Sequence, residues 1–117
     1  MMQTLLVEFG MGSSLRRGDY TQAAKRAVED ALWRNSINLA ELFGFEKTDM
    51  RITLDVGVQR PELVDPAVLR AVFPYGEVSV NLRRGGLDVP RPEGEGHPTI
   101  MANVALSVGF EMERVDG

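Results

Sequence analysis

Two stretches of this chain alternate apolar and other residues so regularly that they constrain its fold more than any other feature. Within residues 51–59, Ile, Leu or Val occupies every second position, and polar residues or glycine fill the positions between them. A longer stretch, residues 100–110, keeps one face apolar and gives the other smaller and partly polar side chains. Side chains alternate between the two faces of a strand, so both stretches predict strands of a sheet that is covered on one face.

Two shorter stretches predict further strands. Residues 5–9 are apolar except for Glu8, and we expect this strand to end at Gly10 and Gly12. Residues 77–83 again alternate apolar and polar side chains, and Gly85-Gly86 then predicts a turn.

Helices are predicted from the residues that begin them. Asp19 with Gln22 forms a capping box, and Asp65 followed by Pro66 combines an N-cap with proline at the first helical position. A further capping box predicts a short turn of helix at residues 38–44. The helix after Asp19 has an unusually small inner face, which would let it sit close to a sheet. That face consists of Tyr20, Ala24, Ala27, Val28 and Ala31.

The predicted order of elements is β-α-β-α-β-β within a single domain spanning residues 1–117. We expect an α+β fold with a four-stranded mixed sheet and both helices on one face. The other face is too mixed in polarity for a monomer core, so we expect a symmetric homo-oligomer, a trimer or a multiple of a dimer. A solvated sheet face is the alternative. The polar residues of that face are Arg51, Thr53, Asp55, Ser79, Asn81, Asn103 and Ser107.

Composition excludes several classes of function. The chain has no cysteine and one histidine, which rules out disulfides and argues against a zinc site. Its net charge of −4 argues against nucleic acid as a partner. No apolar stretch reaches the roughly 20 residues that span a bilayer, and no basic leader is visible. We therefore expect a cytoplasmic protein without membrane contact, metal or cofactor, although composition alone leaves a carboxylate site for Mg²⁺ or Ca²⁺ open.

The segment from Gly10 to Asp19 is the strongest candidate for a site. It joins a strand to a capped helix through three glycines, two serines and two arginines. Free backbone N–H groups and the helix dipole favour a small anion there, and a guanidinium binds carboxylate or phosphate with two parallel hydrogen bonds. Asn103 interrupts the last strand, where a buried amide needs a partner. We predict a small anionic ligand, with a neighbouring subunit contributing, bound by Gly10, Gly12, Ser13, Ser14, Arg16, Arg17 and Asn103.

Catalytic interpretations of the same region stay open. Ser14 with Lys25 as its base, or Glu8 in its apolar strand, could support amide-hydrolase or lyase chemistry. A salt bridge between Glu8 and a nearby arginine is the structural alternative. His97 lies in a loop rich in proline and glycine, and we assign it no catalytic role. A structural or regulatory oligomer without ligand is the third hypothesis.

Several motifs resemble a known family. Gly10-Met11-Gly12, residues 21–28 and residues 102–105 resemble the Lin-0512 family of conserved hypothetical proteins, and the resemblance covers nearly the whole chain. That family's N-terminal motif is GxGxDxHG. Ser14 stands at its acidic position and Arg16 at its histidine position, so the resemblance implies that chemistry needing those two groups is lost or changed here. It implies no specific activity.

The predicted order of elements also resembles the trimeric chorismate-mutase-type α/β fold. Ring-opening amidohydrolases of the cyanuric-acid type use related repeats, each with a glycine-rich loop before a helix. Because those proteins build their sites between subunits or repeats, the resemblance implies an interfacial site here.

Overall fold

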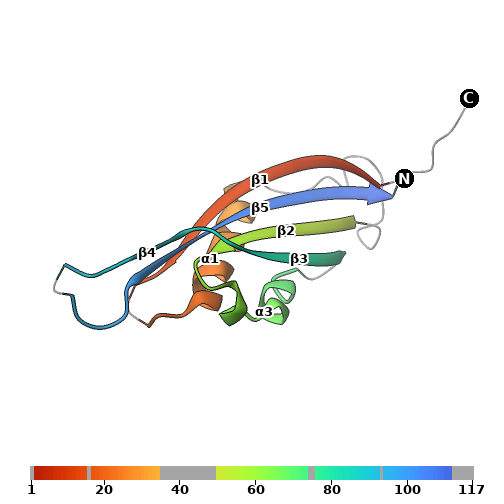
Figure 1. Ribbon diagram of the computed structural model, residues 1–117. Coiled ribbons are helices and arrows are strands. Elements are labelled where there is room, and N and C mark those ends of the chain that lie inside the picture. Colours follow the sequence, from red (N-terminus) through yellow and green to blue (C-terminus); the bar gives the residue numbers. More distant parts are fainter. Residues whose placement is uncertain (1, 16, 35–49, 74–75, 93, 112–117) are drawn as a thin grey trace, which may run out of the picture.

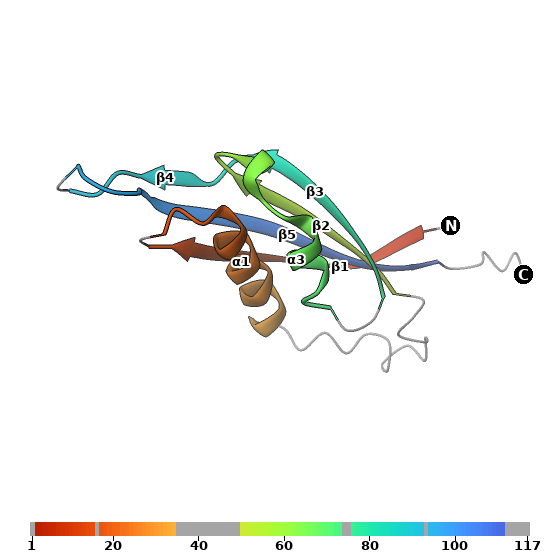
Figure 2. The same ribbon diagram turned by 90° about the horizontal axis from the view of Figure 1, so that it is seen from below.

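In the computed structural model, which describes residues 2–15, 17–34, 50–73, 76–92 and 94–111, one mixed sheet carries helices on a single face (Figure 1). Figure 2, seen from the helical side, shows both α-helices lying in front of that face. The expected α+β architecture is therefore confirmed. The elements are β1 (Met2–Ser14), α1 (Tyr20–Arg34), β2 (Met50–Val58), the 3-10 helix η2 (Pro61–Leu63), α3 (Pro66–Arg70), β3 (Glu77–Arg84), β4 (Leu87–Val89) and β5 (Thr99–Glu111).

The sheet is ordered β1-β5-β2-β3, and β4 pairs with the beginning of β5. Strand β5 runs antiparallel to both of its long neighbours, whereas β2 and β3 run parallel. A parallel pair needs a crossover connection, and η2 and α3 supply it. The last strand of the sequence is thus inserted between the first two, and β1 and β3 form the edges.

The sheet has five strands, not the four predicted. Strand β4 is only three residues long and lies between Gly86 and Pro90, so it carries too little alternation to be found from sequence. Gly86 has a φ of +62°, a left-handed conformation that glycine adopts without strain. The Gln59 side chain donates to the carbonyl oxygens of Gly85 and Gly86 at 3.0 and 3.1 Å, which holds the passage from β3 to β4.

The first strand also differs from its prediction. Strand β1 does not end at Gly10 and Gly12 but continues to Ser14, which is paired with Ile100. A Cβ atom at Gly10 would lie 2.6 Å from the backbone nitrogen of Ala31 in α1, and one at Gly12 would crowd α1 equally. The glycines therefore make room for a helix backbone instead of terminating the strand.

The remaining helix predictions agree with the structure where it describes them. The inner face predicted for α1 is buried throughout. The Asp19 carboxylate accepts the Gln22 N–H at 3.0 Å, and the Asp65 carboxylate accepts the Ala67 N–H at the same distance. The short helical turn predicted at residues 38–44 lies outside the described residues. No helix in the described part of the chain is long and apolar enough to cross a membrane.

Helix α1 also covers part of the exposed edge of β1. The Met11 N–H donates to the Asp30 carboxylate at 2.9 Å, and the Arg26 guanidinium donates to the Ser13 carbonyl oxygen at 2.6 Å. Unpaired backbone groups of an edge strand invite pairing with another chain. The two side chains therefore reduce the risk of edge-to-edge association along this stretch of β1.

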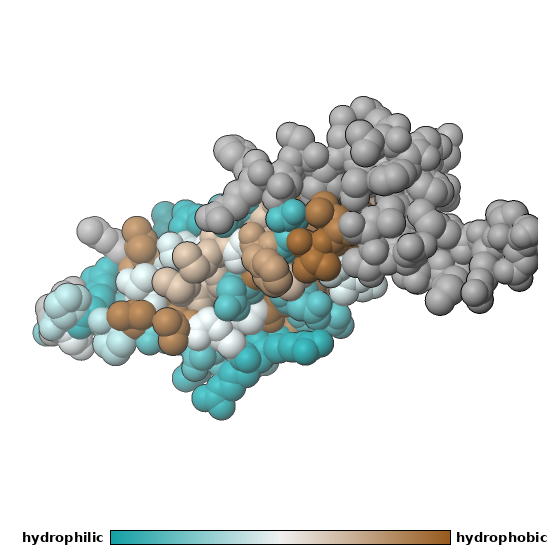
Figure 3. Space-filling view, turned by 90° about the horizontal axis from the view of Figure 1, so that it is seen from above, coloured by the Kyte–Doolittle hydropathy of each residue, from teal (hydrophilic) through white to brown (hydrophobic). Residues whose placement is uncertain are grey.

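The side of the sheet away from the helices, called the open face below, is not covered by any described element. Alternate residues of β2 are buried against the helical side, so Arg51, Thr53 and Asp55 lie on the open face as predicted. Figure 3 looks onto this face and shows hydrophilic residues along one long edge and apolar residues across the middle.

We expect Gly10→Ala to lower the free energy of unfolding by about 1–3 kcal/mol, because the added methyl group would force α1 away from the sheet. The measurement is urea unfolding followed by circular dichroism. Ser13→Ala is the matched control on the opposite face of β1, and it should change stability little. Equal stability of the glycine variant and the wild type would contradict this packing.

Candidate functional site

The residues predicted to form an anion site do not form an open loop. Gly10 and Gly12 lie in β1 and face the backbone of α1. Ser14 is only 3% exposed, and its hydroxyl oxygen accepts the Asp19 N–H at 3.3 Å. The interpretation of residues 10–14 as a loop with free amides is therefore wrong, because the strand continues through the glycines.

A shallow depression of about 410 Å³ does lie beside the start of α1. Arg17 lines it and is exposed, whereas Arg16 lies outside the described residues. The carboxylate of Asp19 accepts a hydrogen bond from the first turn of the helix. The chain's own anion thus occupies the helix N-terminus on which the sequence argument relied.

The weaker catalytic candidates are not brought together either. Glu8 and Ser14 lie on the same strand six residues apart, which corresponds to roughly 20 Å. No hydrogen bond joins Ser14 to Lys25 among the described residues. His97 lies against Gly18, where an added Cβ would be 2.8 Å from the imidazole Nδ1. That contact joins residues 79 positions apart, and no local pattern announces it.

Asn103 lies in a different place from the other predicted site residues. It is on the open face and exposed, so the expectation of a buried amide is wrong. Its side-chain oxygen leans over Gly57, where an added Cβ would lie only 2.5 Å away. The sheet register places Met11, Asn103, Gly57 and Arg83 side by side in one row across four strands.

The neighbouring row contains Phe9, Ala105, Asp55 and Asn81. In both rows the central positions include a very small residue, Ala105 or Gly57, and larger side chains stand on either side. The result is a hollow of about 540 Å³. We call it the row hollow. The side chains important for its chemistry are Phe9, Met11, Asp55, Gly57, Arg83 and Asn103.

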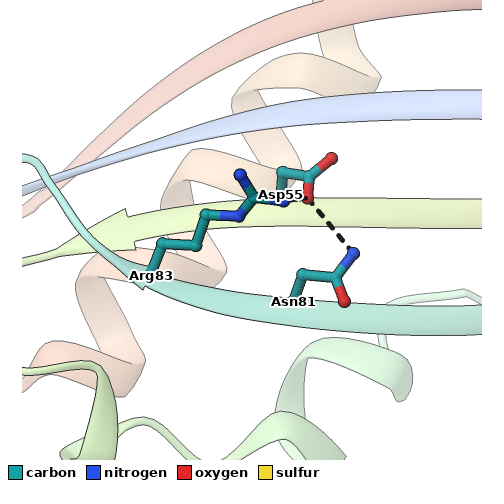
Figure 4. A network of polar contacts seen from close by, with 3 residues as sticks. All are labelled: Asp55, Asn81 and Arg83. Atoms are coloured by element: carbon teal, nitrogen blue, oxygen red, sulfur yellow. Dashed lines mark hydrogen bonds and ion pairs between the residues drawn. The ribbon is translucent and has the colours of Figure 1, made fainter.

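The two sides of the row hollow differ in polarity. On the β1 side, Phe9 and Met11 present apolar surface and are 69% and 55% exposed. On the β3 side, Oδ1 of Asp55 accepts hydrogen bonds from the Asn81 amide at 3.2 Å and the Arg83 guanidinium at 3.3 Å (Figure 4). Such an exposed ion pair contributes little to stability, so it does not by itself explain the arrangement.

A second polar cluster lies on the helical side. Tyr20 is buried, and its hydroxyl donates a hydrogen bond to the Asp88 carboxylate of β4. Oδ1 of Asp88 is also buried and has no hydrogen-bond partner among the described residues. Burial raises the pKa of the Tyr20 phenol, and the hydrogen bond to Asp88 and the charge of Asp88 raise it further, while Arg60 opposes the shift.

The sequence analysis missed this cluster because β4 was not predicted. It missed the row hollow because Gly57 and Ala105 become neighbours only through the strand order. A glycine within an alternating strand was the one available signal. Within the described residues, no group of three or more acidic or histidine side chains is placed to hold a metal ion.

Comparison with known proteins identifies relatives but no activity. Residues 4–108 match the model of the Lin0512 family, described as conserved hypothetical protein. A crystal structure of an FtsZ-like protein of unknown function from Nostoc punctiforme PCC 73102 has the same fold, with a TM-score of 0.84 and 30% sequence identity. The similarity covers 95% of this chain and 98% of that chain. None of the curated proteins matches the sequence significantly.

We expect Tyr20 to titrate above the ordinary tyrosine pKa of 10.0 and Asp88→Asn to lower its midpoint. Tyr75→Phe removes the other tyrosine, so ultraviolet absorbance then reports Tyr20 alone. Because the folded state holds this proton more tightly than the unfolded state, its stabilising effect is complete below pH 10 and is lost as pH rises through the folded-state pKa. An unchanged or higher midpoint in Asp88→Asn would contradict the assignment.

Proposed function

This chain belongs to the Lin0512 family of conserved hypothetical proteins, and from that premise we propose that it binds a small anionic organic molecule in the row hollow. The observation that carries the proposal is the combination, in one concave site, of an exposed aromatic wall and an exposed guanidinium. The hollow has the volume of a small-ligand site.

The apolar wall supports a ligand with an organic body. Phe9 and Met11 stand in adjacent rows of β1, and the floor between them and β3 is formed by Ala105 and Gly57. A flat or compact apolar group placed on this floor would cover the ring of Phe9, which water otherwise surrounds. Burial of that surface contributes about 25 cal/mol per Å².

The polar wall supports a negative charge on that ligand. The Arg83 side chain is 72% exposed, and a guanidinium carries five N–H donors. Its contact with Asp55 leaves donors for a carboxylate or phosphate, which arginine can bind with two parallel hydrogen bonds. The Asn103 amide, across Gly57, offers one donor group and one acceptor.

The proposal keeps the anionic ligand expected from sequence and Asn103 as one of its contacts, but assigns the charge to Arg83 in place of Arg16 or Arg17. It favours binding over catalysis. The described residues that line the hollow include no Ser, Thr, Lys or His that would serve as a nucleophile or its base. An amide hydrolase or lyase built on Ser14, Lys25 or Glu8 has no such concave site at its disposal.

We expect small aromatic and aliphatic carboxylates and phosphates, with benzoate and phenyl phosphate as first probes, to raise the melting temperature at millimolar concentration. Arg83→Gln should weaken their binding about ten- to hundredfold, because it removes a charge-assisted hydrogen bond worth about 1.5–3 kcal/mol. Thermal shift and isothermal titration calorimetry measure the two effects.

Two controls make the result specific. Uncharged benzamide should stabilise the protein much less than benzoate does. Arg70→Gln removes a guanidinium from the last turn of α3, in the helical layer, and should leave binding unchanged. If no probe stabilises the protein, or if Arg83→Gln and Arg70→Gln behave alike, the proposal is wrong.

A further inference from the structure

We infer that a second copy of this chain covers the open face, related to the first by a two-fold axis that runs across the strands between the two sheets. The inference concerns a protein surface and does not depend on the ligand proposed above. It is carried by the distribution of apolar and charged side chains on the open face.

The open face concentrates the exposed apolar surface of the described chain. Seven large hydrophobic residues are exposed among the described residues, and five of them lie on this face. Three are on β1, where they alternate with residues that face α1. Two are on β4, opposite Met101 and Thr99. The five are Val7, Phe9, Met11, Leu87 and Val89. Exposed apolar surface gathered on one face is typical of a protein interface.

The charges of the open face balance one another. Arg51 pairs with Glu77 at 3.2 Å, and Arg83 pairs with Asp55 at 3.3 Å. The net charge of −4 therefore lies elsewhere in the chain. A second copy approaching this face meets no net repulsion, and a membrane surface meets no net positive charge that would attract it.

The positions of these charges fit a copy of the same face. Along β2, Arg51 precedes Asp55, and along the parallel neighbour β3, Glu77 precedes Arg83. A two-fold rotation about an axis across the strands reverses the strand direction and leaves each strand opposite its own copy. Arg51 of one copy then lies opposite Asp55 of the other, and Glu77 lies opposite Arg83. Such an isologous interface pairs opposite charges twice.

The same axis also matches polarity. It places the apolar β1 side over the apolar β1 side of the second copy, and β2 and β3 over their own polar counterparts. An axis parallel to the strands would instead place β1 over β3, which sets apolar residues against polar ones. Only the axis across the strands satisfies both the charge pattern and the apolar pattern.

This arrangement would also complete the row hollow, a consequence that rests on the proposed function. The second copy would close the hollow with its own sheet and bring its Arg51 close to Asp55. A bound anion would then meet two guanidinium groups instead of one. Loss of ligand binding with an intact dimer would reject only the ligand, and a monomer that still binds would reject only the pairing.

We expect light scattering to give the mass of a dimer, or of a multiple of a dimer, at micromolar concentration. Phe9→Glu should convert it to a folded monomer, because an unpaired charge is costly in an apolar interface. Leu63→Glu is the matched control, since Leu63 is 54% exposed but lies in η2. A monomeric or trimeric wild type would overturn the inference, as would dissociation by Leu63→Glu with Phe9→Glu unaffected.

A second experiment tests the axis itself. The chain has no cysteine, so a single introduced thiol reports one position. Thr53 lies between the two charged rows and therefore near the axis. We expect a short bismaleimide to link two copies of Thr53→Cys efficiently and two copies of Glu62→Cys poorly. The reverse result, with circular dichroism showing both variants folded, would place the contact on the helical side and overturn the inference.

Discussion

The backbone of α1 packs directly against the backbone of β1, and this contact sets the arrangement of the other elements. It requires glycine at two alternate positions of the strand and alanine along the facing side of the helix. Contacts of this kind hold a helix closer to a sheet than ordinary side chains allow. That closeness brings Asp30 and Arg26 within hydrogen-bonding distance of the strand's outer backbone groups. One interaction thus covers one face of the sheet and shields part of its edge.

Small residues have opposite consequences on the two faces of the sheet. On the helical face, the space above Gly10 and Gly12 is filled by α1. On the open face, the space above Gly57 and Ala105 is filled by no described element, and the row hollow results. The same residue type therefore indicates close packing in one case and a candidate site in the other. What decides between them is whether a covering element is present, and a single strand's sequence does not contain that information.

Membership of the Lin0512 family and similarity to an FtsZ-like protein of unknown function describe the ancestry of the fold and leave the activity to be argued from this chain. Ser14, at the acidic position of the motif that the family resemblance supplied, is buried and bonded to the backbone at the start of α1. The row hollow lies on the other face of the sheet. The departure from the motif therefore bears on the packing below α1, whereas the ligand and pairing proposals rest on side chains of the open face.

The sequence by itself determined the local elements: the long strands, the caps at Asp19 and Asp65, and the small inner face of α1. These depend on side chains a few residues apart, whose alternation or capping geometry is local. Tertiary structure decided the rest. Strand β4 exists only because β5 offers a partner, and Gly10 lies within a strand only because a helix needs its space. Asn103, Gly57 and Arg83 form one row only because the last strand inserts between the first two, and strand order arises from contacts between distant residues.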